Sequence, residues 1–397
     1  MQKRRVLSIL FAGAAVLGCL ALTPAEAQPA PPAEAGTANW RSVAGGGVHS
    51  CGIRTTGRLY CWGSGAFGSL GDGDDQAQSS PIEVDGGVTT WAAVSPGYFH
   101  TCGRRTDGHL FCWGYAEQGQ LGDAGVAQQN SPVEVDGAHA DWTAVAAGGN
   151  HTCGIRTNHR LYCWGADGFG QLGNGGGNDN VAVPTEVAGN HADWTAVSTG
   201  FVHTCGRRSN GQLYCWGRDL EGQVGNGGPF STTGSPALVA GGVTNWSSVA
   251  AVGYHTCARR GNGRLYCWGE DDDGEVGNGP PFSDRPSPTL VAGGFTNWAS
   301  VTGGLDHTCA RRANGRLYCW GKDFDGQLGR SGGSADQSSP AEVAGRLTTW
   351  TAVSGGQLHT CARRANARIF CWGYNSSGQL GIGSSGASHP TPLEVAA

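Results

Sequence analysis

The sequence has a single methionine, few charged residues and no excess of basic charge. Met1 is the only methionine, and Asp, Glu, Lys and Arg together make up 14% of the 397 residues. The formal net charge at pH 7 is −5. Because a general nucleic-acid-binding protein carries a basic excess, this composition argues against that class, and we predict no nucleic-acid partner.

The linear signatures of common enzyme classes are also missing. The chain has no His-Glu-x-x-His zinc motif, no Gly-x-Ser-x-Gly nucleophile elbow, no phosphate-binding loop and no dinucleotide fingerprint. We therefore predict a protein that is not an enzyme and holds no cofactor and no metal. Catalytic residues that converge from distant segments leave no linear motif, so an enzyme stays open as the alternative.

No segment shows the 3.6-residue period of an amphipathic helix. The chain contains 70 Gly without a strict three-residue period, which excludes collagen, and its 14 Trp exclude plain disorder. Instead, one unit recurs seven times at spacings of 51 or 52 residues. This period predicts a propeller or a solenoid. The units begin at Trp40, Trp91, Trp142, Trp194, Trp246, Trp298 and Trp350.

Each unit predicts four short strands separated by Gly, Asn and Asp. In the unit that begins at Trp142, the first strand is expected at 142–146, the second at 151–156 and the third at 160–164. The fourth strand follows a proline, as at 132–135.

The N-terminal segment has the features of an export signal. A basic start at 3–5 precedes an apolar run at 6–22, and Ala25-Glu26-Ala27 supplies a small-x-small cleavage site. We expect a signal peptide at 1–27, a linker at 28–39 and the repeat domain at 40–397. Cleavage is favoured over a retained anchor, so we expect no membrane span and a secreted, periplasmic or cell-surface protein.

Cys19 offers an alternative to cleavage at the end of the leader. The segment Val16-Leu17-Gly18-Cys19 resembles a bacterial lipoprotein box. Lipidation of Cys19 would tether the protein to a membrane instead of releasing it.

The other 14 cysteines form seven pairs, one in each unit, with nine residues inside each pair. Thr106-Asp107-Gly108 lies midway between Cys102 and Cys112 and fits a three-residue hairpin turn with Gly in the left-handed position. Counting outward from this turn places the two cysteines opposite each other at a non-hydrogen-bonded site, where a disulfide is geometrically allowed. The pairs are Cys51 and Cys61, Cys102 and Cys112, Cys153 and Cys163, Cys205 and Cys215, Cys257 and Cys267, Cys309 and Cys319, and Cys361 and Cys371.

Metal binding is the rival interpretation of these cysteines. A nine-residue spacer is not a zinc-knuckle spacing, and an exported chain occupies an oxidising compartment. The pattern therefore favours seven local disulfides.

Four short motifs recur in order through the units: Gly-x-x-His, Cys-Trp-Gly, Gly-Gln-Leu-Gly and Pro-x-x-Val. Gly-Gln-Leu-Gly stands at 119–122, 170–173, 326–329 and 378–381, with close variants in the other units. In these residues the chain resembles the regulator of chromosome condensation repeat family, over residues 40–395. The resemblance implies an all-β fold, a seven-bladed β-propeller with four antiparallel strands in each blade, and here one disulfide per blade.

The family is functionally diverse, so the fold alone does not assign a function. Its eukaryotic founder is a guanine-nucleotide exchange factor with an inserted hairpin and basic tails, which this chain lacks. Another relative is an exported bacterial propeller that inhibits β-lactamases by covering their active site. We predict an exported, monomeric, non-catalytic protein-binding propeller that engages an unknown partner protein through a flat face or rim. A propeller enzyme with a site at the central channel, an exchange-factor-like activity and a purely structural surface protein are the alternatives.

A histidine precedes the first cysteine of every pair. Histidines spread around a ring are too far apart to share a metal ion, so we favour a structural role over metal binding. In that role we expect each ring nitrogen to bond backbone at the turn between the first two strands. The seven are His49, His100, His151, His203, His255, His307 and His359.

Four acidic runs lie between the expected third and fourth strands, at 72–75, 219–221, 270–275 and 323–325. None has the Asp-x-Asp-x-Asp-Gly spacing of an EF-hand calcium loop, so we expect solvated loops.

Arginines recur around the hairpin turn between the second and third strands. Antiparallel strands put these turns at one end of the propeller and the acidic loops at the other. We expect either local pairing or a basic rim that binds an acidic partner surface. The candidate rim is Arg54, Arg58, Arg105, Arg156, Arg160, Arg208, Arg260, Arg264, Arg312, Arg316, Arg364 and Arg368.

The repeat region is expected to begin and end with a whole four-stranded unit. The first unit begins with its first strand and the last unit ends with its fourth, near 393–395. We therefore expect the ring to close by packing of the seventh blade on the first, without a blade shared between the termini.

Overall fold

The computed structural model describes residues 39–396. The expected signal peptide, the lipoprotein box at Cys19 and nearly all of the linker lie outside the described residues. No helix in residues 39–396 is long and apolar enough to cross a membrane.

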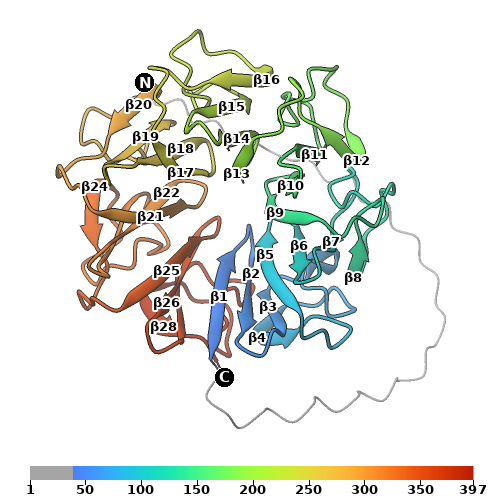
Figure 1. Ribbon diagram of the computed structural model, residues 1–397. Helices are drawn as coiled ribbons and strands as arrows, with labels where there is room; N and C mark the ends of the chain where they lie inside the picture. Colours follow the sequence, from blue (N-terminus) through green and yellow to red (C-terminus); the bar gives the residue numbers. More distant parts are fainter. Residues whose placement is uncertain (1–38, 397) are drawn as a thin grey trace, which may run out of the picture. The chain divides into compact units, whose positions relative to one another are not determined.

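The described residues form 28 strands in seven four-stranded antiparallel sheets, arranged as blades around a central axis (Figure 1). This confirms the predicted seven-bladed propeller. Besides the strands there is a short 3-10 helix, η1 (Ala66–Gly68).

Each blade is made of four consecutive strands, and the first strand of each blade lies innermost (Figure 1). Blade 1 is β1 (Trp40–Gly45), β2 (His49–Arg54), β3 (Leu59–Gly63) and β4 (Gln78–Glu83); blade 2 is β5 (Trp91–Pro96), β6 (His100–Arg105), β7 (Leu110–Gly114) and β8 (Gln129–Glu134); blade 3 is β9 (Trp142–Ala147), β10 (His151–Arg156), β11 (Leu161–Gly165) and β12 (Val181–Glu186); blade 4 is β13 (Trp194–Thr199), β14 (His203–Arg208), β15 (Leu213–Gly217) and β16 (Thr233–Leu238); blade 5 is β17 (Trp246–Ala251), β18 (His255–Arg260), β19 (Leu265–Gly269) and β20 (Arg285–Leu290); blade 6 is β21 (Trp298–Gly303), β22 (His307–Arg312), β23 (Leu317–Gly321) and β24 (Gln337–Glu342); blade 7 is β25 (Trp350–Gly355), β26 (His359–Arg364), β27 (Ile369–Gly373) and β28 (His389–Glu394).

The ring closes where blade 7 packs on blade 1. Strands β25 and β26 both contact β1, and no sheet mixes strands from the two ends of the repeat region (Figure 1). The predicted closure without a shared blade is therefore confirmed.

The hairpin register derived from the turn is also confirmed. Cys102 lies opposite Cys112, the backbone N–H of Arg105 donates to the carbonyl of His109 at 2.9 Å, and Gly108 has a φ of +87°. In all seven blades the paired cysteines have Cα atoms 4.0 or 4.1 Å apart and form a disulfide.

The fourth strands begin earlier than predicted. In blade 2 the strand starts at Gln129, three residues before Pro132. Its pairing with β7 shifts register between Cys112 and Gly114, which leaves the proline in an irregular stretch of an outermost strand. A residue without an N–H is tolerated there because no ladder hydrogen bond is lost.

Tryptophans and disulfides fill the space between adjacent blades. All 14 Trp side chains are at most 3% exposed. One cluster joins the Cys205–Cys215 disulfide, Leu213 and Val224 of blade 4 to Trp246 and Trp268 of blade 5. A buried side chain of this size stabilises the fold by about 2–3 kcal/mol, so each blade depends on its neighbour.

Candidate functional site

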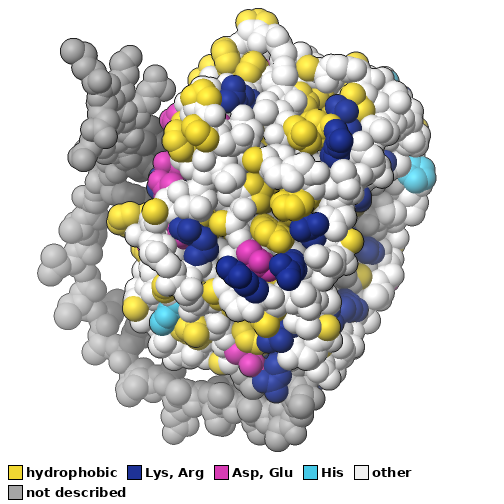
Figure 2. All heavy atoms as spheres, turned by 90° about the vertical axis from the view of Figure 1, so that its left-hand side faces the viewer, with side chains coloured by type: hydrophobic (Ala, Val, Ile, Leu, Met, Phe, Trp, Pro, Cys, Tyr) yellow, Lys and Arg dark blue, Asp and Glu magenta, His cyan; other side chains and the backbone are white. Residues whose placement is uncertain are grey.

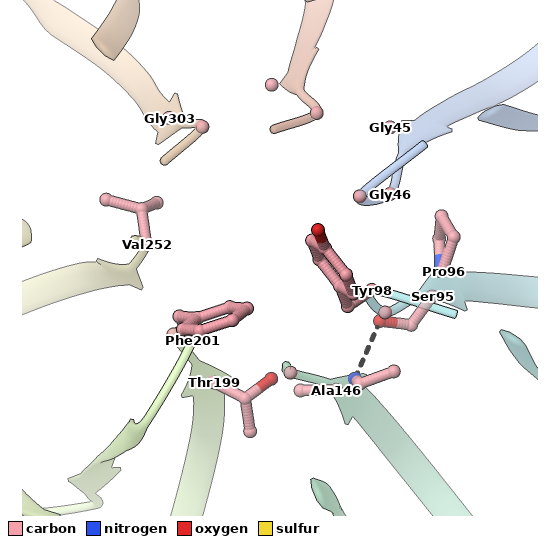
Figure 3. Close-up of a pocket in the computed structure, with 18 of the residues that line it drawn as sticks. Gly45, Gly46, Ser95, Pro96, Tyr98, Ala146, Thr199, Phe201, Val252 and Gly303 are labelled. Carbon is pink, nitrogen blue, oxygen red and sulfur yellow. Dashed lines mark hydrogen bonds between the residues drawn. The ribbon is translucent and has the colours of Figure 1, made fainter. Parts of the chain in front are cut away.

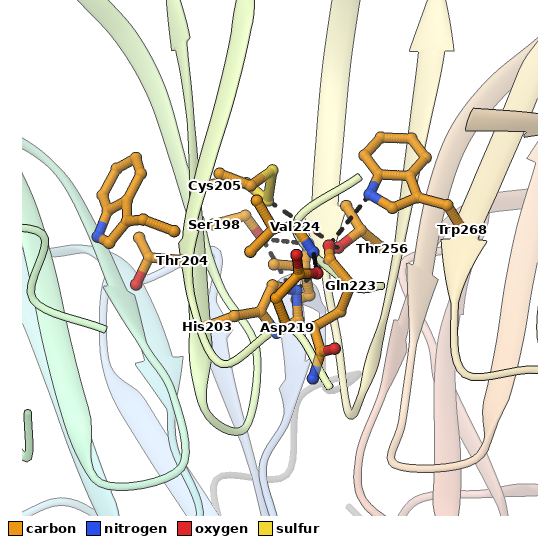
Figure 4. The surroundings of a disulfide bond; sticks show 12 residues. Ser198, His203, Thr204, Cys205, Asp219, Gln223, Val224, Thr256 and Trp268 are labelled. Carbon is orange, nitrogen blue, oxygen red and sulfur yellow. Dashed lines mark hydrogen bonds between the residues drawn. A yellow bond between two sulfur atoms is a disulfide. The ribbon is translucent and has the colours of Figure 1, made fainter. Parts of the chain in front are cut away.

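The repeated histidines hold neighbouring blades together. His203 Nε2 lies 2.8 Å from the Thr256 hydroxyl of the next blade, which donates to the Gln223 carbonyl at 2.8 Å. Trp268 Nε1–H donates to the same carbonyl at 3.0 Å (Figure 4). The prediction that these rings bond backbone at the nearest turn is wrong, because the neighbouring blade presents a hydroxyl at the ring nitrogen.

This bonding pattern sets the tautomer of the ring. The Thr256 hydroxyl proton is used on Gln223, so His203 must donate from Nε2, and its Nδ1 has no hydrogen-bond partner among the described residues. Complete burial lowers the pKa of His203 to about 3, with minor contributions from His151 and Arg218. A neutral ring at physiological pH fits a structural role.

Seven of the candidate rim arginines, one at the end of each second strand, lie against aromatic rings. In blade 5 the Arg260 guanidinium carbon is 4.9 Å from the ring centroid of Trp246 and 4.2 Å from that of Tyr266. Two of the seven also pair with a carboxylate at 2.7 Å, Arg156 with Asp141 and Arg208 with Asp193. The same stacking recurs for Arg54, Arg105, Arg156, Arg208, Arg312 and Arg364.

The five arginines across the hairpin turn lie beside the outermost strand. In four blades a glutamate at the end of that strand binds the guanidinium, and in blade 5 Leu290 replaces the glutamate beside Arg264. The four ion pairs are Arg58 with Glu83, Arg160 with Glu186, Arg316 with Glu342 and Arg368 with Glu394. The use of this rim as a binding surface for a partner stays a prediction.

The opposite end of the propeller carries the turns between first and second strands and the loops between third and fourth strands, and we call it the loop face. The expectation that its acidic runs are solvated is wrong for one aspartate in each of three runs. Asp219, Asp271 and Asp323 are at most 2% exposed. Each accepts the backbone N–H of the residue five positions on, as Asp219 does from Val224 at 2.9 Å (Figure 4), and so folds its own loop.

Three carboxylates from two repeat units meet between blades 5 and 6. Oxygen atoms of Glu270, Glu275 and Asp306 lie within 4.8 Å of one another. Burial, together with the nearby Asp306 and Glu221 charges, raises the pKa of Glu270 to about 8, and burial also raises the pKa of Glu275 and Asp306. Oxygen ligands of this kind suit Ca²⁺ or Mg²⁺, which makes the cluster the group of described residues best able to hold a cation.

Basic and aromatic side chains flank this cluster. Lys322 Nζ bridges Asp273 at 3.1 Å and Asp306 at 3.4 Å. The Arg218 guanidinium pairs with Glu221 at 2.7 Å and lies 4.9 Å from the ring centroid of Tyr254. The run at 270–275 was visible in the sequence, but the participation of Asp306 was not, because Asp306 is on another blade.

The first strands surround a central channel with a cavity of about 260 Å³ (Figure 3). Small residues make up most of its wall, as at Gly45, Ala146 and Thr199. No Asp, Glu, His, Cys, Lys or Arg is among the described residues that line it, and Tyr98 is the one titratable group. Besides Tyr98, the polar side chains of the described lining are uncharged Ser, Thr and Gln, so no carboxylate, imidazole, thiol or amine is present there to activate a hydroxyl.

The mouth of the channel on the loop face departs from the repeat. One position per blade, two residues before each repeated histidine, holds Gly47, Tyr98, Gly149, Phe201, Gly253, Leu305 and Gln357 in blade order. Large residues thus alternate with glycine in the first six blades. A Cβ on Gly47 would lie 2.6 Å from Tyr98, so the glycines make room for the residue at the same position in the next blade.

Tyr98 and Phe201 project into the middle of the channel (Figure 3). Their ring centroids are 5.4 Å apart, and Phe201 continues to Tyr254 at 5.7 Å. On the other side Tyr98 contacts Phe99 at 4.3 Å, and Phe99 contacts Phe67 at 5.3 Å. A run of aromatic rings therefore crosses the loop face from blade 1 to blade 5. This run was not predicted from the sequence, although comparison of this one position across the seven units singles out Tyr98 and Phe201.

Comparison with known proteins agrees with the architecture. The RCC1-like domain model matches residues 13–304, and the regulator of chromosome condensation (RCC1) repeat matches residues 298–327 and 350–379. The chain is 29% identical over 350 residues to the ultraviolet-B receptor UVR8 of Arabidopsis thaliana, an alignment that covers 86% of this chain and 79% of the receptor.

Solved structures show the same fold at lower sequence identity. Prp20p from Saccharomyces cerevisiae superposes with a TM-score of 0.76 at 18% identity, covering 87% of each chain. Human WBSCR16 superposes with a TM-score of 0.74 at 21% identity, covering 82% of this chain and 86% of the human protein. The match to the domain model extends over more than half of the sequence, and the chain therefore belongs to the RCC1-like domain family.

Proposed function

We propose that this chain is an exported, non-catalytic propeller that binds a partner protein through the loop face at the mouth of the central channel. The observation that carries the proposal is the aromatic run across this mouth. Tyr98, Phe201 and Tyr254 are partly exposed and break the repeat. Aromatic side chains on a rigid surface are typical anchors of protein interfaces, because they bury a large area at little entropic cost.

Two further observations favour binding over the enzyme alternative. The channel wall carries no acidic, basic, histidine or cysteine side chain among the described residues, so it offers few groups for acid–base or nucleophilic chemistry. The structural relative Prp20p has binding properties to Gsp1p and histones. Both support a module whose role is to recognise another protein.

Export is supported by the cysteine chemistry. All 14 cysteines of the repeats are paired in disulfides, and such bonds persist in oxidising compartments. The basic start, apolar run and cleavage site at 1–27 supply the targeting signal for that compartment.

Affinity capture tests the proposal. The chain from Gln28 onward, purified with its disulfides intact, would be immobilised and exposed to exported proteins of its source. We expect the double variant Tyr98→Ala/Phe201→Ala to lose the protein captured by the wild type. Gln357→Arg, which adds bulk and charge at the mouth without removing a ring contact, should lose it too.

The matched control lies on the opposite end of the propeller. Arg316→Glu/Arg368→Glu reverses two charges of the candidate rim, and thermal unfolding would verify that each variant is folded. Capture that survives both mouth variants but fails in this control would assign the partner to the rim instead of the mouth.

A further inference from the structure

The end of the propeller opposite the loop face carries the turns between second and third strands, and we call it the turn face. Six of the seven blades place at least one carboxylate there beside their basic residues. One carboxylate position is the end of the fourth strand, where Glu342 binds Arg316. The other directly precedes the first tryptophan of a blade, where Asp193 binds Arg208.

Blade 5 has lost both carboxylates and kept its arginines. Asn245 precedes its first tryptophan, and Leu290 ends its fourth strand. Arg259, Arg260 and Arg264 remain, so the turn end of this blade has three positive charges and no carboxylate of its own.

Arg264 is the exposed cation of this group, whereas Arg259 and Arg260 are half-buried. Among the twelve candidate rim arginines, all of which are described, Arg264 alone has no contact to its guanidinium within hydrogen-bonding or ring-stacking distance. Arg260, in contrast, is stacked on Trp246 and Tyr266.

Apolar surface lies beside this arginine. Leu290 pairs in register with Tyr266, two residues after Arg264, and is 38% exposed. Leu238 replaces the glutamate of blade 4 in the same way and is 40% exposed. On the side of the molecule that shows blades 5 and 6, basic side chains lie next to apolar ones, and acidic side chains are fewer (Figure 2).

We propose that the turn end of blade 5 is a docking site for an acidic segment of a partner protein, separate from the mouth of the channel. A carboxylate of the partner would bind Arg264 in place of the missing glutamate, and an adjoining apolar side chain would cover Leu290. The four ion pairs of the other blades show that this position of the fold accepts a carboxylate.

The extent of the free charge favours a protein segment over a nucleic acid or a membrane. A duplex or an anionic bilayer engages a broad basic surface. Here the corresponding arginines of blades 1, 3, 6 and 7 are already paired with glutamates, so at this position of the repeat Arg264 is the arginine that lacks a carboxylate partner.

An array of octapeptides tests the site, with each acidic peptide printed beside its Gln or Asn counterpart. The labelled probe is the full chain from Gln28 onward. We expect the wild type to prefer acidic peptides that contain an apolar residue next to the acid. Arg264→Ala should weaken this binding about tenfold, the effect of losing one charge pair. Arg316→Ala removes an arginine that is already paired with Glu342 and should change binding less than twofold.

Leu290→Glu provides a second, independent variant. It recreates the ion pair of the other blades, so it should occupy Arg264 and abolish peptide binding while the protein stays folded. An array on which no acidic peptide exceeds its amide counterpart would overturn the proposal, as would equal binding by the wild type, Arg264→Ala and Leu290→Glu. Arg264-dependent binding to duplex DNA or phosphatidylglycerol vesicles, without binding to any acidic peptide, would overturn the assignment to a protein segment.

Discussion

The Thr256 hydroxyl links blades 4 and 5 through two hydrogen bonds. It accepts from His203 and donates to the Gln223 carbonyl, and all three groups are buried. In Thr256→Val the shape is kept, but the buried His203 N–H loses its partner and the Gln223 carbonyl keeps only its bond from Trp268. We expect the free energy of unfolding in urea to fall by about 1–3 kcal/mol.

Thr195 gives the matched control for this substitution. Its exposed hydroxyl donates to the Arg207 carbonyl at 3.0 Å, within one blade. Thr195→Val should cost less than about 1 kcal/mol, because water replaces the lost bond. Equal losses in the two variants would show that the hydrogen bond between the blades contributes no more to the free energy of unfolding than the exposed bond within one blade.

Glu270 makes stability depend on pH in a defined direction. Burial raises its pKa from 4.5 to about 8, so between these values the unfolded chain releases a proton that the folded chain keeps. The free energy of unfolding therefore decreases as pH rises through this window. Glu270→Gln removes this effect and should be more stable than the wild type at pH 9, on the order of 1–2 kcal/mol.

Urea unfolding of the Glu270→Gln variant and the wild type at pH 4 and pH 9 provides the measurement. At pH 4 the side chain is protonated in both states, so the two proteins should differ little. A difference of the same size at both pH values would mean that ionisation of Glu270 is not its cause.

At the scale of the strand pair, each disulfide lies inside one hairpin. Cys205 and Cys215 are ten residues apart and directly opposite each other. The turn sequence Ser209-Asn210-Gly211 and simple counting were enough to predict this pairing, because every interaction that sets the register is local in the chain.

We expect Cys205→Ala/Cys215→Ala to lower the free energy of unfolding by about 2–3 kcal/mol, since only a short loop is released in the unfolded chain. Peptide mapping of the wild type without reduction should link each cysteine of the repeats to the one ten positions on. Links between different blades, or free thiols in the repeats, would contradict the predicted framework.

At the scale of the whole molecule, a buried pair of hydrogen bonds is among the contacts that join the two ends of the repeat region. His359 Nε2 of blade 7 lies 2.7 Å from the Ser50 hydroxyl of blade 1, which donates to the Gln379 carbonyl at 3.0 Å. Six blades have threonine at this position, and blade 1 alone has serine.

Ser50→Thr should strengthen this seam. The hydroxyl contacts are kept and one methyl group is buried, so we expect the free energy of unfolding to rise by about 0.5–1 kcal/mol. Ser50→Ala leaves the His359 ring without its partner, while the Gln379 carbonyl keeps its bond from Trp62, and should lower it by about 1–3 kcal/mol. Thermal and urea unfolding would measure both, and a destabilised Ser50→Thr would show that the seam has no room for the methyl group of the other six blades.

The sequence by itself determined the number of blades, the hairpin register and the disulfide pairing. Each of these follows from residues about ten apart or from the spacing of the units, so local geometry and repetition were sufficient. The rim arginines could be named in the same way, but their partners could not.

Only the tertiary structure decided which side chains meet across blades. His203 and Thr256 are 53 residues apart, and Tyr98 and Phe201, which form the aromatic mouth, are about twice as far apart in the chain. The carboxylates of Glu270 and Asp306 likewise meet across two blades. The physical reason is that a repeat specifies its own fold locally, whereas a contact between units depends on how the closed ring places each blade against the next.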